Sequence, residues 1–330
     1  MSERLASRPR SRREPDRPRR VRIDPDWIRR NGVYVALALL LVINIAITDN
    51  FVSDATLRLQ LIQVTPVLIV ALGMALVIGT QGIDLSVGAV MALAAALIPL
   101  YIGYGTAVAI TIAVLAGGIS GALAGTLVAR VGVQPIIATL GIMVAGRGVA
   151  NLFGGEIKSI RDPGVVALGS GSLLGVPYVV VIAAVVAATT WFLVRRSTFG
   201  RQLVAIGGNK RAAELAGLPV RRVLLTTYVL CGLLAALAGV LLAARSQASD
   251  PTKVGLLVEL SAITAVVLGG TPLSGGQVRI AGTIAGALLM QLITATLIFH
   301  DIPDSTAQIA QAVIVVAAVY VQLGRRKARS

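Results

Sequence analysis

The sequence predicts an all-α, polytopic integral membrane protein with about ten transmembrane helices, broken helices at glycine-rich motifs, and both termini in the cytoplasm. The 330-residue chain is 56% hydrophobic and has a mean hydropathy of +0.84, too apolar for a soluble domain. Its apolar runs approach the ~20 residues that a helix needs to cross a bilayer. Its basic residues form three blocks, with 11 Arg in 1–30, 7 basic residues in 195–222 and 4 in 325–329. Short basic segments beside spans stay in the cytoplasm.

Composition also excludes several classes of protein. The net charge of +15 could indicate nucleic-acid binding, but the basic blocks lack the interleaved aromatic residues that stack on bases. The single Cys231 excludes an intrachain disulfide, and the single His300 excludes a histidine-rich metal site. We therefore expect no catalytic triad, no metal and no bound cofactor.

The chain divides into a disordered Arg-rich cytoplasmic tail over 1–30, a membrane domain over 31–324 and a basic tail over 325–330. The first tail has too little apolar content to fold and is suited to contact anionic lipid headgroups. The first apolar run, 33–48, is predicted to be an uncleaved span rather than a signal peptide. The basic region before it is very long, and no small-residue cleavage site follows it.

The remaining spans follow in order, with the chain alternating between the two sides of the membrane. They are predicted at 57–78, 87–101, 106–128, 135–151, 176–194, 223–243, 260–270, 280–299 and 306–323. Gly121 and Gly125 form a small-xxx-small pattern, which allows close helix packing in lipid. The outer loop around 156–162 is expected to be irregular. The run 260–270 is short for a span and ends in Gly269-Gly270-Thr271-Pro272, which indicates a broken helix.

The central feature is the polar break 79–88, which contains Gly82, Asp84, Ser86 and Gly88 between two apolar runs. An Asp at the centre of a membrane helix costs roughly 2.5 to 3.5 kcal/mol, so it faces protein or a cavity. Two interpretations remain open. Asp84 or Ser86 caps the next helix, or Asp84 has a pathway or gating role.

Two other motifs do not indicate nucleotide chemistry. The segment 273–277 spells Leu-Ser-Gly-Gly-Gln, a motif of ABC-type ATPases, but the chain has no Gly-Lys pair and so no Walker A loop. The glycines of 169–175 lack the spacing and the βαβ context of a dinucleotide site. The segments 85–88 and 273–276 each follow an apolar run that ends in Gly, which fits either an internal repeat or coincidence.

The basic segment 195–222 is expected to contain a two-turn helix. Asn209 is suited to the N-cap, residues 210–216 favour helix, and Gly217 is suited to a left-handed C′ position. The apolar residues of this helix have no cover in their own loop. They therefore predict either a partner protein or a helix that lies on the membrane surface.

The motifs together resemble those of permease subunits of ABC importers for monosaccharides, of the ribose and galactofuranose type. The resemblance covers most of 33–323. It rests on the strings Thr198-Phe199-Gly200-Arg201, Ala205-Ile206-Gly207-Gly208-Asn209, Ala212-Ala213, Gly217-Leu218, Gly82-Ile83-Asp84-Leu85-Ser86-Val87-Gly88, Gln134-Pro135 to Gly141 with Arg147-Gly148, and Leu268-Gly269-Gly270 to Gly275-Gly276.

The resemblance implies the partners and the sites. It implies a multi-pass protein of the cytoplasmic (inner) membrane that imports a monosaccharide together with a second permease subunit, an ABC ATPase subunit that binds the ATP, and an extracytoplasmic sugar-binding protein. The residues assigned to ATPase coupling are Gly208, Asn209, Ala212, Ala213, Glu214 and Gly217. Those assigned to the translocation pathway or gating are Asp84, Ser86, Gly82, Gly88, Arg147, Asn151 and Ser274.

Three other functions remain as alternatives. Branched-chain amino-acid ABC permeases are a related group, although the Gly82–Gly88 string favours a sugar. An ion-coupled secondary transporter would need several acidic residues within the membrane. The sequence places only Asp84 in the transmembrane region. A membrane scaffold for a soluble partner is the third. Neighbouring genes for an ATPase and a binding protein would distinguish an ABC permease from a secondary transporter and from a scaffold. Ligand-dependent ATPase stimulation in a reconstituted complex would be the most informative experiment.

Overall fold

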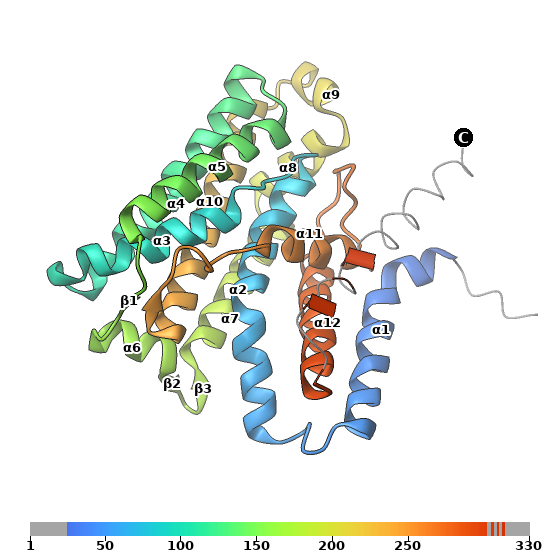
Figure 1. Ribbon diagram of the computed structural model, residues 1–330. Helices are drawn as coiled ribbons and strands as arrows, with labels where there is room; N and C mark the ends of the chain where they lie inside the picture. The colour runs from blue at the N-terminus through green and yellow to red at the C-terminus, as the bar shows by residue number, and fades with distance from the viewer. Residues whose placement is uncertain (1–24, 302–304, 307–308, 310–311, 314–330) are drawn as a thin grey trace, which may run out of the picture.

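The computed structural model describes residues 25–301, 305–306, 309 and 312–313, and the regular structure within them is helical apart from four very short strands (Figure 1). The longer helices are α1 Pro25–Ile47, α2 Asp54–Gly79, α3 Val87–Tyr101, α4 Thr106–Thr126, α5 Pro135–Gly154, α7 Tyr178–Arg196, α10 Val220–Ser246 and α12 Ile280–Phe299. The shorter helical elements are η1 Ile102–Tyr104, the π-helical η2 Leu127–Val131, α6 Pro163–Ser170, α8 Thr198–Gly208, α9 Lys210–Leu215 and α11 Val258–Leu268. The strands are β1 Lys158–Ser159, β2 Ser172–Leu173, β3 Val176–Pro177 and β4 Ala248–Ser249.

Among the described residues, seven helical segments are long and apolar enough to cross a membrane: α2, Val87–Tyr104, Thr106–Val131, α5, α7, α10 and α12. They agree closely with the predicted spans. The apolar part of α1 and the broken α11 are shorter, at Asn31–Ile47 and Val258–Leu268. Most of the predicted tenth span, 306–323, lies outside the described residues, so the count of ten and the side of the C-terminus stay predictions.

The N-terminal boundary differs from the predicted one. Helix α1 begins at Pro25, inside the segment 1–30 that the sequence assigns to a disordered tail. Residues 1–24 and the tail 325–330 lie outside the described residues. The helix therefore starts before its apolar run, 33–48.

The core forms where α2 and α10 pack together, with α3 and α4 against α10. The inner half of α2 is continuously buried from Val64 to Gly79 apart from the half-buried Val67. Glycines allow the helices to touch through their backbones. A Cβ atom at Gly125 of α4 would lie 3.0 Å from the Cα of Leu225 on α10, and one at Gly121 would overlap the Tyr228 carbonyl. The small-xxx-small prediction is therefore confirmed as an α4–α10 contact.

At one end of the bundle, the lower end in Figure 1, the loop 156–162 is irregular as predicted, apart from the two residues of β1, and short elements flank it. Strand β1 pairs antiparallel with β4, and β2 with β3. Asp162 caps α6 by accepting the N–H groups of Gly164 and Val165 at 3.0 Å, and it also accepts the Thr106 hydroxyl at 2.6 Å. The regular elements at this end thus lie mainly outside the predicted loop.

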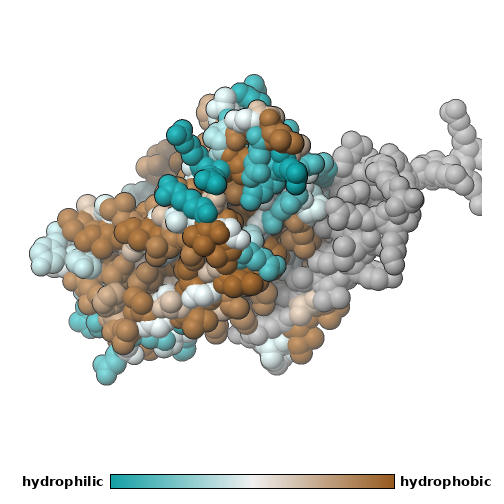
Figure 2. Space-filling view, turned by 90° about the horizontal axis from the view of Figure 1, so that it is seen from above, coloured by the Kyte–Doolittle hydropathy of each residue, from teal (hydrophilic) through white to brown (hydrophobic). Residues whose placement is uncertain are grey.

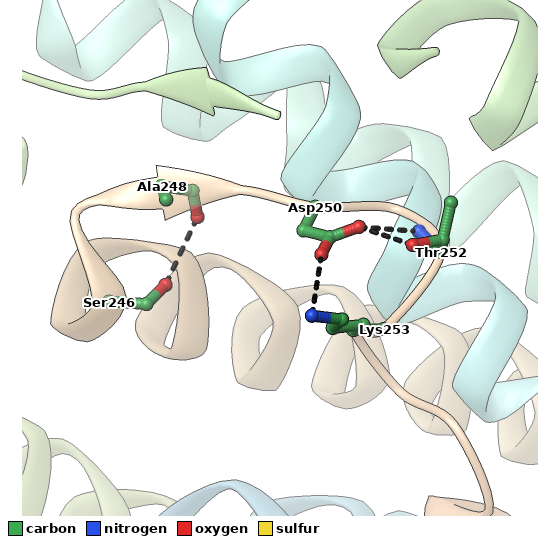
Figure 3. A network of polar contacts seen from close by, with 5 residues as sticks. All are labelled: Ser246, Ala248, Asp250, Thr252 and Lys253. Atoms are coloured by element: carbon green, nitrogen blue, oxygen red, sulfur yellow. Dashed lines mark hydrogen bonds and ion pairs between the residues drawn. The ribbon is translucent and has the colours of Figure 1, made fainter. Parts of the chain in front are cut away.

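The turn after α10 is held by local polar contacts (Figure 3). The Asp250 carboxylate accepts the Thr252 N–H at 3.1 Å and also its hydroxyl, and Lys253 Nζ lies 4.0 Å from the second oxygen. The hydrogen bond from the Thr252 hydroxyl, helped by the Lys253 charge, lowers the pKa of the Asp250 carboxyl. Ser246 Oγ donates to the Ala248 carbonyl at 3.0 Å and closes the other side of the turn. The turn is thereby fixed between α10 and α11.

At the opposite end, α8, α9 and the loop 269–279 lie together, at the top of Figure 1. Seen from that end, hydrophilic residues gather over part of the surface and apolar residues cover the flanks (Figure 2). The sequence predicts only one short helix in 195–222, and α8 is an additional helix of 11 residues. It forms because Leu203 and Ile206 are buried, at 0% and 1% exposure, against the bundle.

Candidate functional site

The break between α2 and α3 is a local turn built around Asp84. Asp84 is 1% exposed, and its Oδ1 accepts the Ser86 N–H at 2.9 Å and the Ser86 hydroxyl at 2.6 Å. Ser86 occupies the N-cap position of α3 but its side chain makes no capping bond. The capping interpretation is therefore wrong for Ser86. Asp84 instead binds a residue that precedes the helix.

Asp84 lies deep in the bundle. Its carboxylate contacts the thiol of Cys231, which follows the first residue of α10 by eleven positions. At about 1.5 Å per residue, that contact lies about 16 Å from the start of a helix of 27 residues. The carboxylate is thus near the middle of α10 rather than at an end.

Gly82 and Gly88 are required by close contacts on either side of Asp84. A Cβ at Gly82 would lie 2.5 Å from the hydroxyl oxygen of Tyr228, and one at Gly88 would overlap the Gly255 carbonyl. Both distances fall below those that real Cβ atoms adopt. The two glycines therefore allow the turn to pack directly on α10 and on the segment before α11.

Arg147 and a second acid lie beside Gly88. Arg147 Nη1 donates to the carbonyls of Pro251 and Val254 at 2.9 and 2.7 Å, and Glu259 attracts it electrostatically. Glu259 Oε2 would lie 2.6 Å from a Cβ at Gly88 and has no hydrogen-bond partner among the described residues. Glu259 was not predicted as a site residue, although an acid one residue inside the apolar helix α11 is a signal of function in a membrane protein.

The other pathway residues do not gather at Asp84. Thr139 at the start of α5 donates to the Ile83 carbonyl at 3.3 Å, whereas Asn151 is twelve residues, or about 18 Å, further along α5 and is exposed. Ser274 is exposed in the loop before α12. The structure therefore keeps Gly82, Asp84, Ser86 and Gly88 together, with Arg147 nearby, and places Asn151 and Ser274 elsewhere.

The predicted two-turn helix is present as α9. Asn209 Oδ1 accepts the Ala212 N–H at 3.0 Å, and Gly217 has a φ of +76°, as a left-handed C′ residue requires. Gly208, Ala212, Glu214 and Gly217 are exposed.

Ala213 does not belong to the exposed surface of α9. It is only 4% exposed and packs in the hydrophobic core of the bundle. The residue that projects most is Leu215, which is 83% exposed. The outward apolar surface of α9 is therefore Ala212, Leu215 and Ala216, and the assignment of Ala213 to it is wrong.

Comparisons with known proteins show which family the chain is similar to. The family described as branched-chain amino acid transport system / permease component matches residues 57–319. The galactofuranose transporter permease protein YtfT of Escherichia coli (strain K12) is 39% identical over 302 residues, which are 88% of this chain and 89% of that protein. The ribose import permease protein RbsC of the same strain is 37% identical over 89% of this chain and 94% of its own. The L-arabinose ABC transporter permease protein AraH of Azospirillum brasilense is 36% identical over 92% of this chain and 90% of its own. No solved structure matches significantly.

Proposed function

The chain belongs to the family described as branched-chain amino acid transport system / permease component, and we propose that it is the subunit through which a monosaccharide crosses the membrane in an ABC importer. It is a multi-pass protein of the cytoplasmic membrane. The observation that carries the proposal is similarity at 36–39% identity, along about nine tenths of the chain, to permeases named for galactofuranose, ribose and arabinose.

The description of the family names branched-chain amino acids, but these relatives favour a sugar. A fructose import permease of Bifidobacterium longum, 36% identical over 264 residues, is also among the similar proteins. The chain thus resembles permeases for both five- and six-carbon sugars. The substrate class that we propose is accordingly a monosaccharide, without a choice among them.

The energy source is assigned to a partner. The sequence has the Leu273–Gln277 string but no Gly-Lys pair, so a Walker A phosphate loop is absent from this chain. We expect ATP to be bound by a separate ABC ATPase. The exposed Leu215 of α9 would give that partner an apolar contact, and the nearby Arg195, Arg196 and Arg201 favour the cytoplasmic side for this end.

The proposed assembly has three further components besides this chain. They are a second permease subunit, the ATPase subunits and an extracytoplasmic sugar-binding protein. The binding protein would dock at the opposite end of the bundle, which carries α6 and the β2–β3 hairpin (Figure 1).

Reconstitution in liposomes tests this function. The chain would be purified with its ATPase and binding protein, and uptake of labelled ribose, arabinose, galactofuranose, fructose and leucine would be measured with and without ATP. We expect ATP-dependent uptake of one of the sugars and stimulation of ATPase activity by the loaded binding protein. Uptake of leucine alone, or uptake driven by an ion gradient without ATP, would contradict the proposal.

A further inference from the structure

Three segments that are far apart in the sequence meet at the inner end of the bundle. They are residues 79–81 at the end of α2, 207–208 at the end of α8, and 275–276 in the loop before α12. We call this set the glycine junction. The Gly276 N–H donates to the Gly79 carbonyl at 3.0 Å, and the side-chain amide of Gln81 donates to the Gly207 carbonyl at 2.7 Å.

The glycine junction is packed backbone to backbone. A Cβ at Gly207 would overlap the Gly79 carbonyl and lie 2.7 Å from the Gly276 nitrogen. A Cβ at Gly275 would lie 2.5 Å from Cγ of Gln81 and 2.8 Å from the Gly207 carbonyl oxygen. Because the glycines bring these backbones into direct contact, a displacement of one segment acts directly on the other two.

Gln81 is the residue of the junction that carries a side chain across it. Its φ is +68°, in the left-handed region that residues other than glycine rarely adopt. It is exposed, yet its amide is fixed to a carbonyl 126 positions further along the chain. An exposed residue with a strained backbone and a long-range bond indicates a positional role.

The junction also joins the two parts of the candidate site. Gly208 directly precedes Asn209, the N-cap of α9, and Gln81 is three residues before Asp84. We propose that Gln81 is a positioning residue that transmits the movement of α9 to the Asp84 turn. When the docked ATPase displaces α9, the Gly207 carbonyl moves with α8 and carries Gln81, and with it residues 82–86.

This inference rests on the proposed function, so its test uses the reconstituted ABC complex and measures two rates in the same liposomes. The variant Gln81→Glu keeps the size of the side chain but turns an acceptor toward the Gly207 carbonyl, so the hydrogen bond is lost. The variant Gln81→Asn keeps the amide and suits a left-handed backbone, but it is one methylene too short to reach. The matched control is Gln134→Glu, since Gln134 is exposed before α5 and makes no capping bond.

We expect both Gln81 variants to assemble and hydrolyse ATP while the number of sugar molecules imported per ATP falls about five- to tenfold. That factor matches the loss of one net hydrogen bond. The control should keep the wild-type ratio. A purely structural role would lower the yield of complex and leave the ratio unchanged, so an unchanged ratio overturns the proposal. Failure of both variants to assemble would also overturn it, since Gln81 would then serve the fold. Failure of the wild type to import any sugar would instead contradict the proposed function.

Discussion

The exposed Leu215 gives a direct test of α9 as the ATPase-docking helix. Leu215 is 83% exposed, so nearly the whole side chain is available for burial by a partner. Burying a leucine side chain contributes about 1.5 to 3 kcal/mol. Truncation in Leu215→Ala should therefore cost about 2 kcal/mol of binding, which corresponds to a Kd for the ATPase weakened roughly 30-fold.

The same change should leave the permease itself intact. Substitution of an exposed residue alters the free energy of unfolding by about 0.5 kcal/mol at most. Ala213 supplies the contrast because it is 4% exposed and packs in the core, so Ala213→Leu should overpack the site and cost about 1 to 3 kcal/mol of stability. The matched control is Leu174→Ala in the β2–β3 turn, where Leu174 is 97% exposed at the other end of the bundle.

The assay is binding of the purified ATPase subunit to the permease in nanodiscs, together with the melting temperature of each variant. Leu215→Ala should lose affinity at an unchanged melting temperature, Ala213→Leu should melt earlier, and Leu174→Ala should match the wild type in both measurements. Binding by Leu215→Ala within twofold of the wild type would refute the docking surface and favour a helix on the membrane surface.

Three further predictions follow from the structure. Asp84→Asn keeps an oxygen that accepts from Ser86 but removes the charge, so the yield of complex should stay the same or rise while sugar uptake falls tenfold or more. Uptake near the wild-type rate would show that Asp84 only stabilises the turn. In a Cys231→Ala background, a cysteine at Ala216 should react with an impermeant maleimide only from the cytoplasm, and one at Lys158 only from outside. Reaction of both cysteines from the same side would contradict the predicted topology. Gly239→Ala places a Cβ against the backbone of Met91 and should lower stability by about 1 to 3 kcal/mol, whereas Gly103→Ala, with open space around it, should melt like the wild type.

Local signals were sufficient to predict most of the bundle. Helix α12 spans Ile280–Phe299, the same range that its apolar run predicts, and the bounds of α2 exceed the predicted 57–78 by only a few residues. In a bilayer, an apolar run of sufficient length has few alternatives to a helix, since every backbone polar group must be bonded internally. Length and hydropathy therefore specify the spans without knowledge of their packing.

Helix α8 could not be predicted in the same way. Its sequence contains Gly200, Gly207 and Gly208, each costing about 1 kcal/mol relative to alanine in an isolated helix, and it lies in a basic segment that reads as a loop. Burial of Leu203 and Ile206 stabilises it, and Gly207 is required by its contact with the Gly79 carbonyl. Both are tertiary effects.

The error at Ala213 has a related cause. The sequence correctly places α9 and its cap, but alanine, the smallest helix former, carries no sign of which face it occupies. Only the packing of the helix against the bundle turns Ala213 inward and Leu215 outward. Glu259 was missed because its position beside Gly88 depends on how the segment before α11 folds back against α3.

The spacing of the string from Gly82 to Gly88 now has a physical account. Asp84 must precede Ser86 by two positions, because that separation lets one carboxylate oxygen accept both the N–H and the hydroxyl of Ser86. Gly82 lies where the chain leaves α2 and passes close to the Tyr228 hydroxyl. Gly88 lies at the start of α3, in contact with the Gly255 carbonyl. A side chain at either glycine would separate the turn from α10 or from the segment before α11. Asp84 would then lose the protein surroundings that keep its carboxylate out of lipid, so the glycines and the acid depend on one another.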